Sequence, residues 1–312
     1  MDRAPLSHLT IGQLPRHEYG RRLRCGDLVL SAGPFALRLR SDIAAVKAGV
    51  RLLYADHPVE DPPVCCDYVV DVSRDRGLRR WIRPLARFRF DHVPTFEPLP
   101  ITHALPLLEW SLNWCISSRS HQFLVLHAAV IERDGRAAVL PAPPGSGKST
   151  LCAALIHRGW RLMSDELALI DLEDGHVHAL ARPVGLKNRS IDLIAEFAKG
   201  CTLSALTRDT AKGTVALLKP PVEHVRRMHE PARIAWIVFP RYEHQAVPQL
   251  SERSKSDTML ELGRNAFNYA YNLRQGFRVL GDIVDRSRCL NFTYSRLDDG
   301  VTTFDRLAAD IV

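Results

Sequence analysis

The feature that most constrains the fold is a glycine-rich segment between an apolar run and a helical pattern. Residues 142–149 read Ala-Pro-Pro-Gly-Ser-Gly-Lys-Ser and fit the phosphate-binding loop, or Walker A pattern, with alanine replacing its first glycine. Glycines let successive backbone N–H groups turn toward a phosphate at the N-terminus of the next helix. The predicted nucleotide-binding residues are Pro144, Gly145, Ser146, Gly147, Lys148, Ser149 and Thr150.

The segment before the loop predicts an antiparallel hairpin that ends at the phosphates. An Asp-Gly pair at 134–135 is the strongest two-residue hairpin signal in the chain. Pairing outward from this turn sets Val130 opposite Val139 and then His127 opposite Ala142. His127 is therefore expected at the mouth of the loop, on a strand arrangement unlike the usual parallel nucleotide-binding sheet.

The spacing after the loop predicts which carboxylate returns to the phosphates. A helix over 149–158 carries the chain roughly 15 Å away before Gly159 ends it. A strand rising ~3.3 Å per residue from Trp160 then returns after about five residues, at Asp165. The alternation of a strand places Glu166 on the opposite face.

Asp171 closes a run that imitates a Walker B strand, but it lies six residues beyond Asp165 and is rejected as a metal ligand. A carboxylate at Asp165 is suited to accept the proton of an attacking hydroxyl or to bind Mg²⁺, with His127 orienting it. Two plainer interpretations stay open, namely a solvated strand end for the Asp-Glu pair and a satisfied core group for His127.

Three segments together resemble the kinase domain of HPr kinase/phosphorylase: Leu126–Val130, Pro144–Ser149 and Arg158–Glu166. The resemblance extends over about residues 120–200. It implies a P-loop kinase fold of the HPr kinase and phosphoenolpyruvate carboxykinase type, with ATP and Mg²⁺ as cofactors and a serine hydroxyl as acceptor. Where that family has an acidic residue after the loop serine, this chain has Thr150, so the metal shell is expected to differ.

The resemblance also implies roles for individual residues. Lys148 would bind the transferring phosphate, Ser149 the metal together with Asp165, and Asp165 would be the general base. His127 and Glu166 would support it, which gives the predicted catalytic set of Asp165, Lys148, His127 and Glu166.

The whole chain resembles the group called HprK-related kinase A, on the stretches 182–190 and 209–214. Related kinases act on a small carrier protein, on peptide serines or on free serine, so all three acceptors stay open. Three basic residues are candidates for neutralising phosphate charge that Lys148 does not reach: Arg182, Lys187 and Lys212.

The length of 312 residues favours two domains. We predict an α+β domain over 1–119, a candidate for docking a substrate or partner, and an α/β kinase domain with a mixed sheet over 120–312. Seven arginines between 74 and 89 add to the docking hypothesis, against which stands an ordinary solvated surface. Smaller elements are expected as strands at 28–30, 35–40 and 67–72, and as helices beginning near Ser41 and near Thr102. A further helix is expected from Asp257 to about Leu280, with its aromatic residues Phe267, Tyr271 and Phe277 used for packing.

The net charge of +7 is compatible with an anionic ligand but does not indicate nucleic acid. The chain has no apolar run long enough to span a bilayer and no signal-peptide pattern, which predicts a cytoplasmic protein. The resemblance leaves formation of a homo-oligomer open.

Two other functions are weighed against a protein kinase: a regulatory module that binds nucleotide without transferring phosphate, and a small-molecule kinase for free serine.

Overall fold

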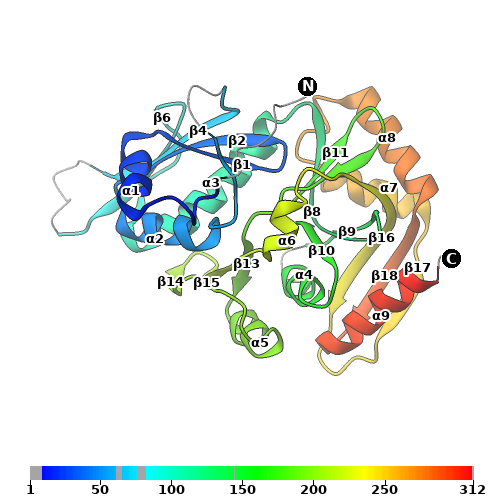
Figure 1. Ribbon diagram of the computed structural model, residues 1–312. Coiled ribbons are helices and arrows are strands. Elements are labelled where there is room, and N and C mark those ends of the chain that lie inside the picture. Colours follow the sequence, from blue (N-terminus) through cyan, green and yellow to red (C-terminus); the bar gives the residue numbers. More distant parts are fainter. Residues whose placement is uncertain (1–8, 61–64, 76–81, 144, 311–312) are drawn as a thin grey trace.

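The computed structural model of the chain describes residues 9–60, 65–75, 82–143 and 145–310. Within these residues it is a mixed α/β protein with sheets of seven, eight and three strands. Figure 1 shows the N-terminal half in blue and cyan at the left and the C-terminal half in green to red at the right. The predicted boundary at 119 coincides with the end of helix α3 (Ala104–Arg119), and the division into two domains stays a prediction.

The N-terminal half is built on a mixed sheet with the strand order β3-β1-β2-β4-β5-β6 and with β7 paired to β5. Its strands are β1 (Leu28–Ala32), β2 (Phe35–Arg40), β3 (Val59–Glu60), β4 (Tyr68–Arg74), β5 (Leu85–Phe90), β6 (Val93–Pro94) and β7 (Leu99–Pro100). Helices α1 (Arg16–Cys25), α2 (Ala44–Leu53) and α3 contribute buried side chains to the same core. The three strands predicted in this half are confirmed.

Both helices predicted in the N-terminal half are present, but their predicted caps are wrong. The Ser41 hydroxyl accepts from the Ile43 N–H at 3.2 Å and donates to the Val72 carbonyl at 2.6 Å, so it ties the chain to β4. Helix α2 starts after Ile43, which has no side-chain cap. Thr102 lies within the 3₁₀ turn Ile101–His103 that precedes α3.

The arginine-rich stretch is only partly described. Three of its seven arginines lie outside the described residues, namely Arg76, Arg79 and Arg80. Arg87 is paired with Asp75 at 3.0 Å, and Arg89 lies 3.9 Å from Asp71. These two arginines serve internal pairs, and the docking hypothesis stays a prediction.

The C-terminal half is built on a sheet with the order β10-β8-β11-β12-β16-β18-β17, in which β9 pairs with both β8 and β16. Its strands are β8 (Phe123–Arg133), β9 (Arg136–Pro141), β10 (Arg161–Ser164), β11 (Leu167–Asp171), β12 (His176–His178), β16 (Ala232–Tyr242), β17 (Gln249–Glu252) and β18 (Arg288–Tyr294). A separate small sheet holds β13 (Val184–Lys187), β14 (Thr207–Thr210) and β15 (Gly213–Leu218).

The predicted hairpin before the loop is confirmed with its register. Val130 pairs with Val139, and Ala128 pairs with Pro141, the last residue of β9. His127 therefore stands where β9 turns into the loop. Beyond the hairpin the sheet is mixed, because β9 and β18 both run parallel to β16.

The alternation of side chains along β8 divides the core at His127. Phe123 and Val125 belong to the N-terminal core, while Ala129 and Ile131 pack in the core under helices α4 (Lys148–Ile156) and α9 (Leu297–Ala309). His127 belongs to the same face of β8 and lies between the part that enters the N-terminal core and the part that enters the core under α4 and α9. The other face of the sheet is covered by α7 (Lys255–Arg264) and α8 (Leu273–Arg286).

None of the helices in the described parts is both long and apolar enough to cross a bilayer.

The helix expected from Asp257 to about Leu280 is wrong as one element, because the chain leaves the helix between α7 and α8. The freed backbone pairs with β8 instead, and the carbonyl of Asn265 accepts from the His127 N–H at 2.8 Å. Three aromatic residues expected to pack are largely exposed, namely Phe267, Tyr271 and Phe277.

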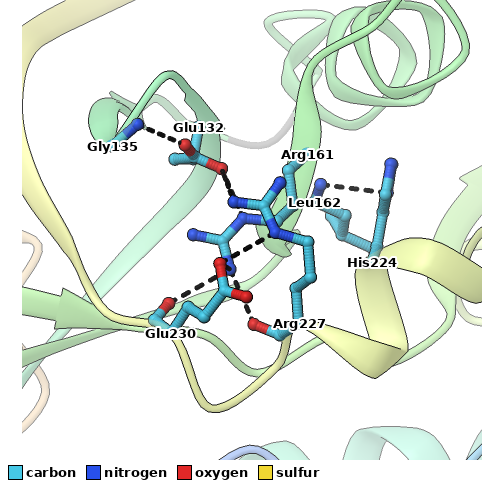
Figure 2. A network of polar contacts seen from close by, with 7 residues as sticks. All are labelled: Glu132, Gly135, Arg161, Leu162, His224, Arg227 and Glu230. Atoms are coloured by element: carbon cyan, nitrogen blue, oxygen red, sulfur yellow. Dashed lines mark hydrogen bonds and ion pairs between the residues drawn. The ribbon is translucent and has the colours of Figure 1, made fainter.

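Edge strand β10, which leads to Asp165, is held by a buried ion pair and a short helix (Figure 2). The Arg161 guanidinium donates to Glu132, and both side chains are at most 4% exposed. It also donates to the carbonyls of Arg227 and Glu230. The Leu162 N–H, on the open edge of the strand, donates to Nδ1 of His224 at 3.1 Å. His224 lies on helix α6 (Val222–Arg226). The edge is thereby covered and the strand is fixed.

Replacing Arg161 by leucine should destabilise the fold by about 3–5 kcal/mol, because Glu132 would keep a buried charge without its main partner. The control is Arg226→Leu, since Arg226 pairs with Glu223 on the surface with both side chains more than 60% exposed, and its loss should cost less than about 1 kcal/mol. Denaturant unfolding measures both. Equal free energies of unfolding for the two variants would contradict the role given to Arg161.

Candidate active site

The phosphate-binding loop joins β9 to α4 as predicted, and its glycines are required by the backbone. Gly145 and Gly147 have φ angles of 88° and 87°, which residues with a Cβ rarely adopt. A Cβ on Gly147 would also lie 2.4 Å from the Tyr294 hydroxyl, which donates to the Gly147 carbonyl. Gly147 is the N-cap of α4. Pro144 lies outside the described residues.

The start of α4 supplies the groups that an anion needs. Lys148, Ser149 and Thr150 form its first turn, where free backbone N–H groups and the helix dipole favour negative charge. The Lys148 side chain is buried, and its Nζ lies 3.2 Å from His127 Nε2. The loop, the lysine and the histidine are therefore brought together as the sequence predicts.

Asp165 and Glu166 form the two-residue connection between β10 and β11, and both carboxylates lie in the site. The expectation that they point to opposite faces is wrong, because strand geometry ends at Ser164 and alternation no longer applies. Asp171 pairs with Phe123 at the far end of β11, which agrees with its rejection as a metal ligand.

The Asp165 carboxylate is almost fully buried beside the loop. It is 4% exposed, and its Oδ2 accepts from the Gly185 N–H at 3.1 Å. Burial, and then the negative charge of Glu166, raise the pKa of Asp165 to about 6. The Lys148 ammonium, and after it the Ser149 hydroxyl and the Gly185 N–H, act in the opposite direction without cancelling that rise. At neutral pH the side chain is an ionised base with a proton affinity above that of an ordinary aspartate.

Glu166 is held in its ionised form by its neighbours. Burial favours the neutral acid, but the hydrogen bond with His127 and the charge of Lys148 keep the pKa of Glu166 well below its usual range. His127 Nε2 lies 3.0 Å from Glu166 Oε2 and 3.2 Å from Lys148 Nζ. Both contacts use the same ring nitrogen, Nε2, which donates to the Glu166 carboxylate when it carries a hydrogen and accepts from the Lys148 ammonium when it does not. His127 can therefore switch between these two hydrogen bonds.

Arg182 lies in an internal cluster, so the structure does not offer it to a phosphate as the sequence predicted. Its guanidinium donates to Glu109 Oε2 at 2.6 Å, to Asn113 Oδ1 at 2.8 Å and to the Tyr54 hydroxyl at 3.3 Å. Glu109 and Tyr54 are themselves buried and belong to the N-terminal half. The cluster fixes the segment that enters β13, three residues before the N–H of Gly185.

Lys187 and Lys212, the other two phosphate candidates, lie near the two carboxylates on β13 and on the turn between β14 and β15. Lys187 ends β13 and lines a cavity together with Asp165, Glu166 and Trp110. Lys212 lies in the turn between β14 and β15, with its ammonium 4.9 Å from the centre of the Trp110 ring. Both lysines are thus near the site, and what they bind stays a prediction.

The loop region fits a nucleotide and a magnesium ion by its unpaired oxygens. In the described residues, the buried atoms Asp165 Oδ1 and Ser146 Oγ have no hydrogen-bond partner. Mg²⁺ is usually held by one or two carboxylates together with substrate phosphates. No group of three or more His, Cys, Asp and Glu side chains in the described parts forms a metal site of its own. Asp165 and Ser149 are therefore the residues suited to a metal that arrives with a nucleotide.

Sequence reasoning missed the residues that complete the site from a distance. Gly185 supplies an N–H to Asp165, while Glu109, Trp110 and Asn113 come from α3 in the N-terminal half. The sequence predictions rested on the rise per residue along β8, β10 and α4. Such spacing does not show that α3, from the N-terminal half, packs against the site. The available signal was Glu109, an acidic residue that directly follows the apolar stretch 104–108.

Comparisons with known proteins give a short family match and a distant structural likeness. Residues 106–187 match the family described as SynChlorMet cassette protein ScmC, which is less than half of the chain. No curated protein matches the chain. The structure of the HPr(Ser) kinase/phosphatase from Coxiella burnetii is similar at 13% identity with a TM-score of 0.28, and the match covers 60% of this chain and 98% of that one. The resemblance to HprK-related kinase A stays a prediction.

Replacing Glu166 by glutamine should lower the pKa of Asp165 from about 6, because it removes the neighbouring negative charge. The value should stay above that of an exposed aspartate, since burial is the larger cause and is unchanged. Carboxyl-carbon NMR titration of wild type and variant measures the shift. Glu173→Gln, in an exposed turn, is the matched control and should leave Asp165 unchanged. An unaltered Asp165 titration in Glu166→Gln would contradict the coupling.

Proposed function

We propose that this chain is a Mg-ATP-dependent kinase that transfers the γ-phosphate to a serine hydroxyl of a small carrier protein or peptide, with Asp165 as general base. The observation that carries the proposal is the position of Asp165, a buried carboxylate with its pKa raised to about 6 at the N-terminus of α4. A base with a pKa near the working pH combines the ionised form with a strong pull on a proton.

The remaining residues have roles that follow from their positions. The loop N–H groups and Lys148 would cradle the β- and γ-phosphates at the start of α4. Ser149 and Asp165 are the residues that would hold Mg²⁺, whose chemistry is to neutralise charge on those phosphates. Since phosphoryl transfer depends chiefly on positioning and electrostatics, a rigid loop and a fixed base are the main requirements.

His127 and Glu166 are proposed to support Asp165 and not to take the proton in its place. The negative charge of Glu166 helps to raise the proton affinity of Asp165. His127 is hydrogen-bonded to Glu166 and lies against Lys148, so it connects the two carboxylates, Asp165 and Glu166, with the lysine proposed to bind phosphate. We expect both to act on the pH dependence and rate of transfer more than on nucleotide binding.

The raised pKa favours a kinase over a module that binds nucleotide without transfer. An ionised carboxylate in a dry site lowers the stability of the fold, and such groups are concentrated at functional sites. Nucleotide binding alone needs the loop and Lys148 but no base. A kinase for free serine would use the same residues and differ in its acceptor, so the two are separated by assay.

The direct test is transfer from γ-labelled ATP with Mg²⁺, offered to free serine and to lysate proteins under about 10 kDa. Asp165→Asn should keep ATP binding and lose transfer by roughly 10²-fold or more, because the base is removed without a change in shape. The control is Asp171→Asn, which makes the same change at the far end of β11 and should stay within about twofold of wild type. Asp165→Asn with wild-type transfer would refute the base and favour the regulatory module.

A further inference from the structure

A cavity opens on the two carboxylates from a direction that the phosphate-binding loop does not share. Asp165 and Glu166 line it together with Trp110 and Asn113 from α3 and Lys187 from β13. None of the described residues of the loop and none of the first turn of α4 lines it. The cavity therefore touches the proposed base but not the groups proposed to hold ATP.

The position of the base between loop and cavity assigns the cavity to the acceptor. The Asp165 carboxylate is influenced by Lys148 and Ser149 from the loop and also forms part of the cavity wall. Phosphoryl transfer places the attacking and leaving oxygens roughly in line, on opposite sides of the transferred group. With ATP in the loop, the attacking hydroxyl has to approach from the side on which the cavity lies.

The acidic groups of the cavity are already neutralised, except for the base itself. Glu109 is bound by Arg182, and Glu166 lies against His127 and Lys148. Lys187 lines the cavity, and Lys212 lies beside it over Trp110; the charge of Glu166 acts on both lysines, but neither is held by a close carboxylate contact of this kind. Neither Lys187 nor Lys212 makes an ion pair with a carboxylate in the described parts of the chain.

The two lysines are also close enough to affect each other. Burial, and then the charge of Lys187, lower the pKa of Lys212. Lys212 lies over the Trp110 ring, which directs its ammonium toward the cavity wall formed by α3. A bound anion would relieve the repulsion between Lys187, in the cavity wall, and Lys212, beside that wall. ATP held in the loop would direct its phosphates at Lys148, so the anion that these lysines fit belongs to the acceptor.

We propose that this cavity binds an acceptor that carries a carboxylate beside its hydroxyl, with Lys187 and Lys212 holding that carboxylate; this rests on the proposed kinase activity. The hydroxyl gives its proton to Asp165, and its oxygen forms a bond to the γ-phosphorus. The bond from the γ-phosphorus to the bridging oxygen breaks, and ADP leaves with that electron pair. Free serine and a serine flanked by acidic residues in a peptide both have this chemistry.

The test compares acceptors that differ only in the carboxylate. L-serine is set against ethanolamine, and a serine peptide flanked by aspartates is set against the same peptide flanked by asparagines. Wild type should favour the carboxylate-bearing member of at least one pair by ~10-fold or more in kcat/KM, and the pair that responds identifies the source. Lys187→Gln and Lys212→Gln should remove the preference while the KM for ATP stays within about twofold. Lys199→Gln, an exposed lysine after α5 (Arg189–Phe197), is the control.

The outcomes separate this inference from the proposed function. Transfer by wild type without a preference in either pair would overturn the inference and leave the kinase intact. Lysine variants that raise the KM for ATP but keep the acceptor preference would overturn it too, because the lysines would then serve the nucleotide. Release of no γ-phosphate to any acceptor or to water would contradict the kinase itself, and the inference with it.

Discussion

The hydrogen bond from the Gly185 N–H to the buried Asp165 carboxylate is the contact on which the site depends. Asp165 directly follows β10, which is fixed at the sheet edge by Arg161. Gly185 reaches its place on a segment that Arg182 ties to the N-terminal half. Each side of this contact is thus held by its own buried ion pair.

The site lies where two apolar cores meet. Side chains of β8 before His127 enter the N-terminal core, and those after it enter the core under α4. Polar groups at this junction are enclosed from both sides, which strengthens their electrostatic interactions and makes an unpaired charge costly. Burial at the junction is the largest cause of the high proton affinity of Asp165, whereas Glu166 is held ionised by His127 and Lys148 against the effect of burial.

Local spacing predicted the parts of the site that lie on consecutive elements. The hairpin register brought His127 to the loop, and the helix-and-strand arithmetic brought Asp165 back to it, because both rest on fixed rises per residue. Glu166 was misplaced because a turn interrupts the strand. The internal pairing of Arg182 was missed because its partner Glu109 lies 73 residues away, a contact that only the tertiary fold creates. The cavity at Trp110 was missed for the same reason.

The central claim is that the fold holds Asp165 ionised in a place that opposes ionisation, and the pH dependence of stability tests it most directly. The folded-state pKa of about 6 lies above the usual 3.8, so the stability of wild type relative to Asp165→Asn falls as the pH rises from about 4 to about 6. His57 and His224, whose pKa values are lowered to about 4, titrate in the same range but are common to both proteins. The variant should therefore exceed wild type by roughly 2–3 kcal/mol in unfolding free energy at pH 8, with the difference vanishing toward pH 4. A difference that does not change with pH would contradict the account.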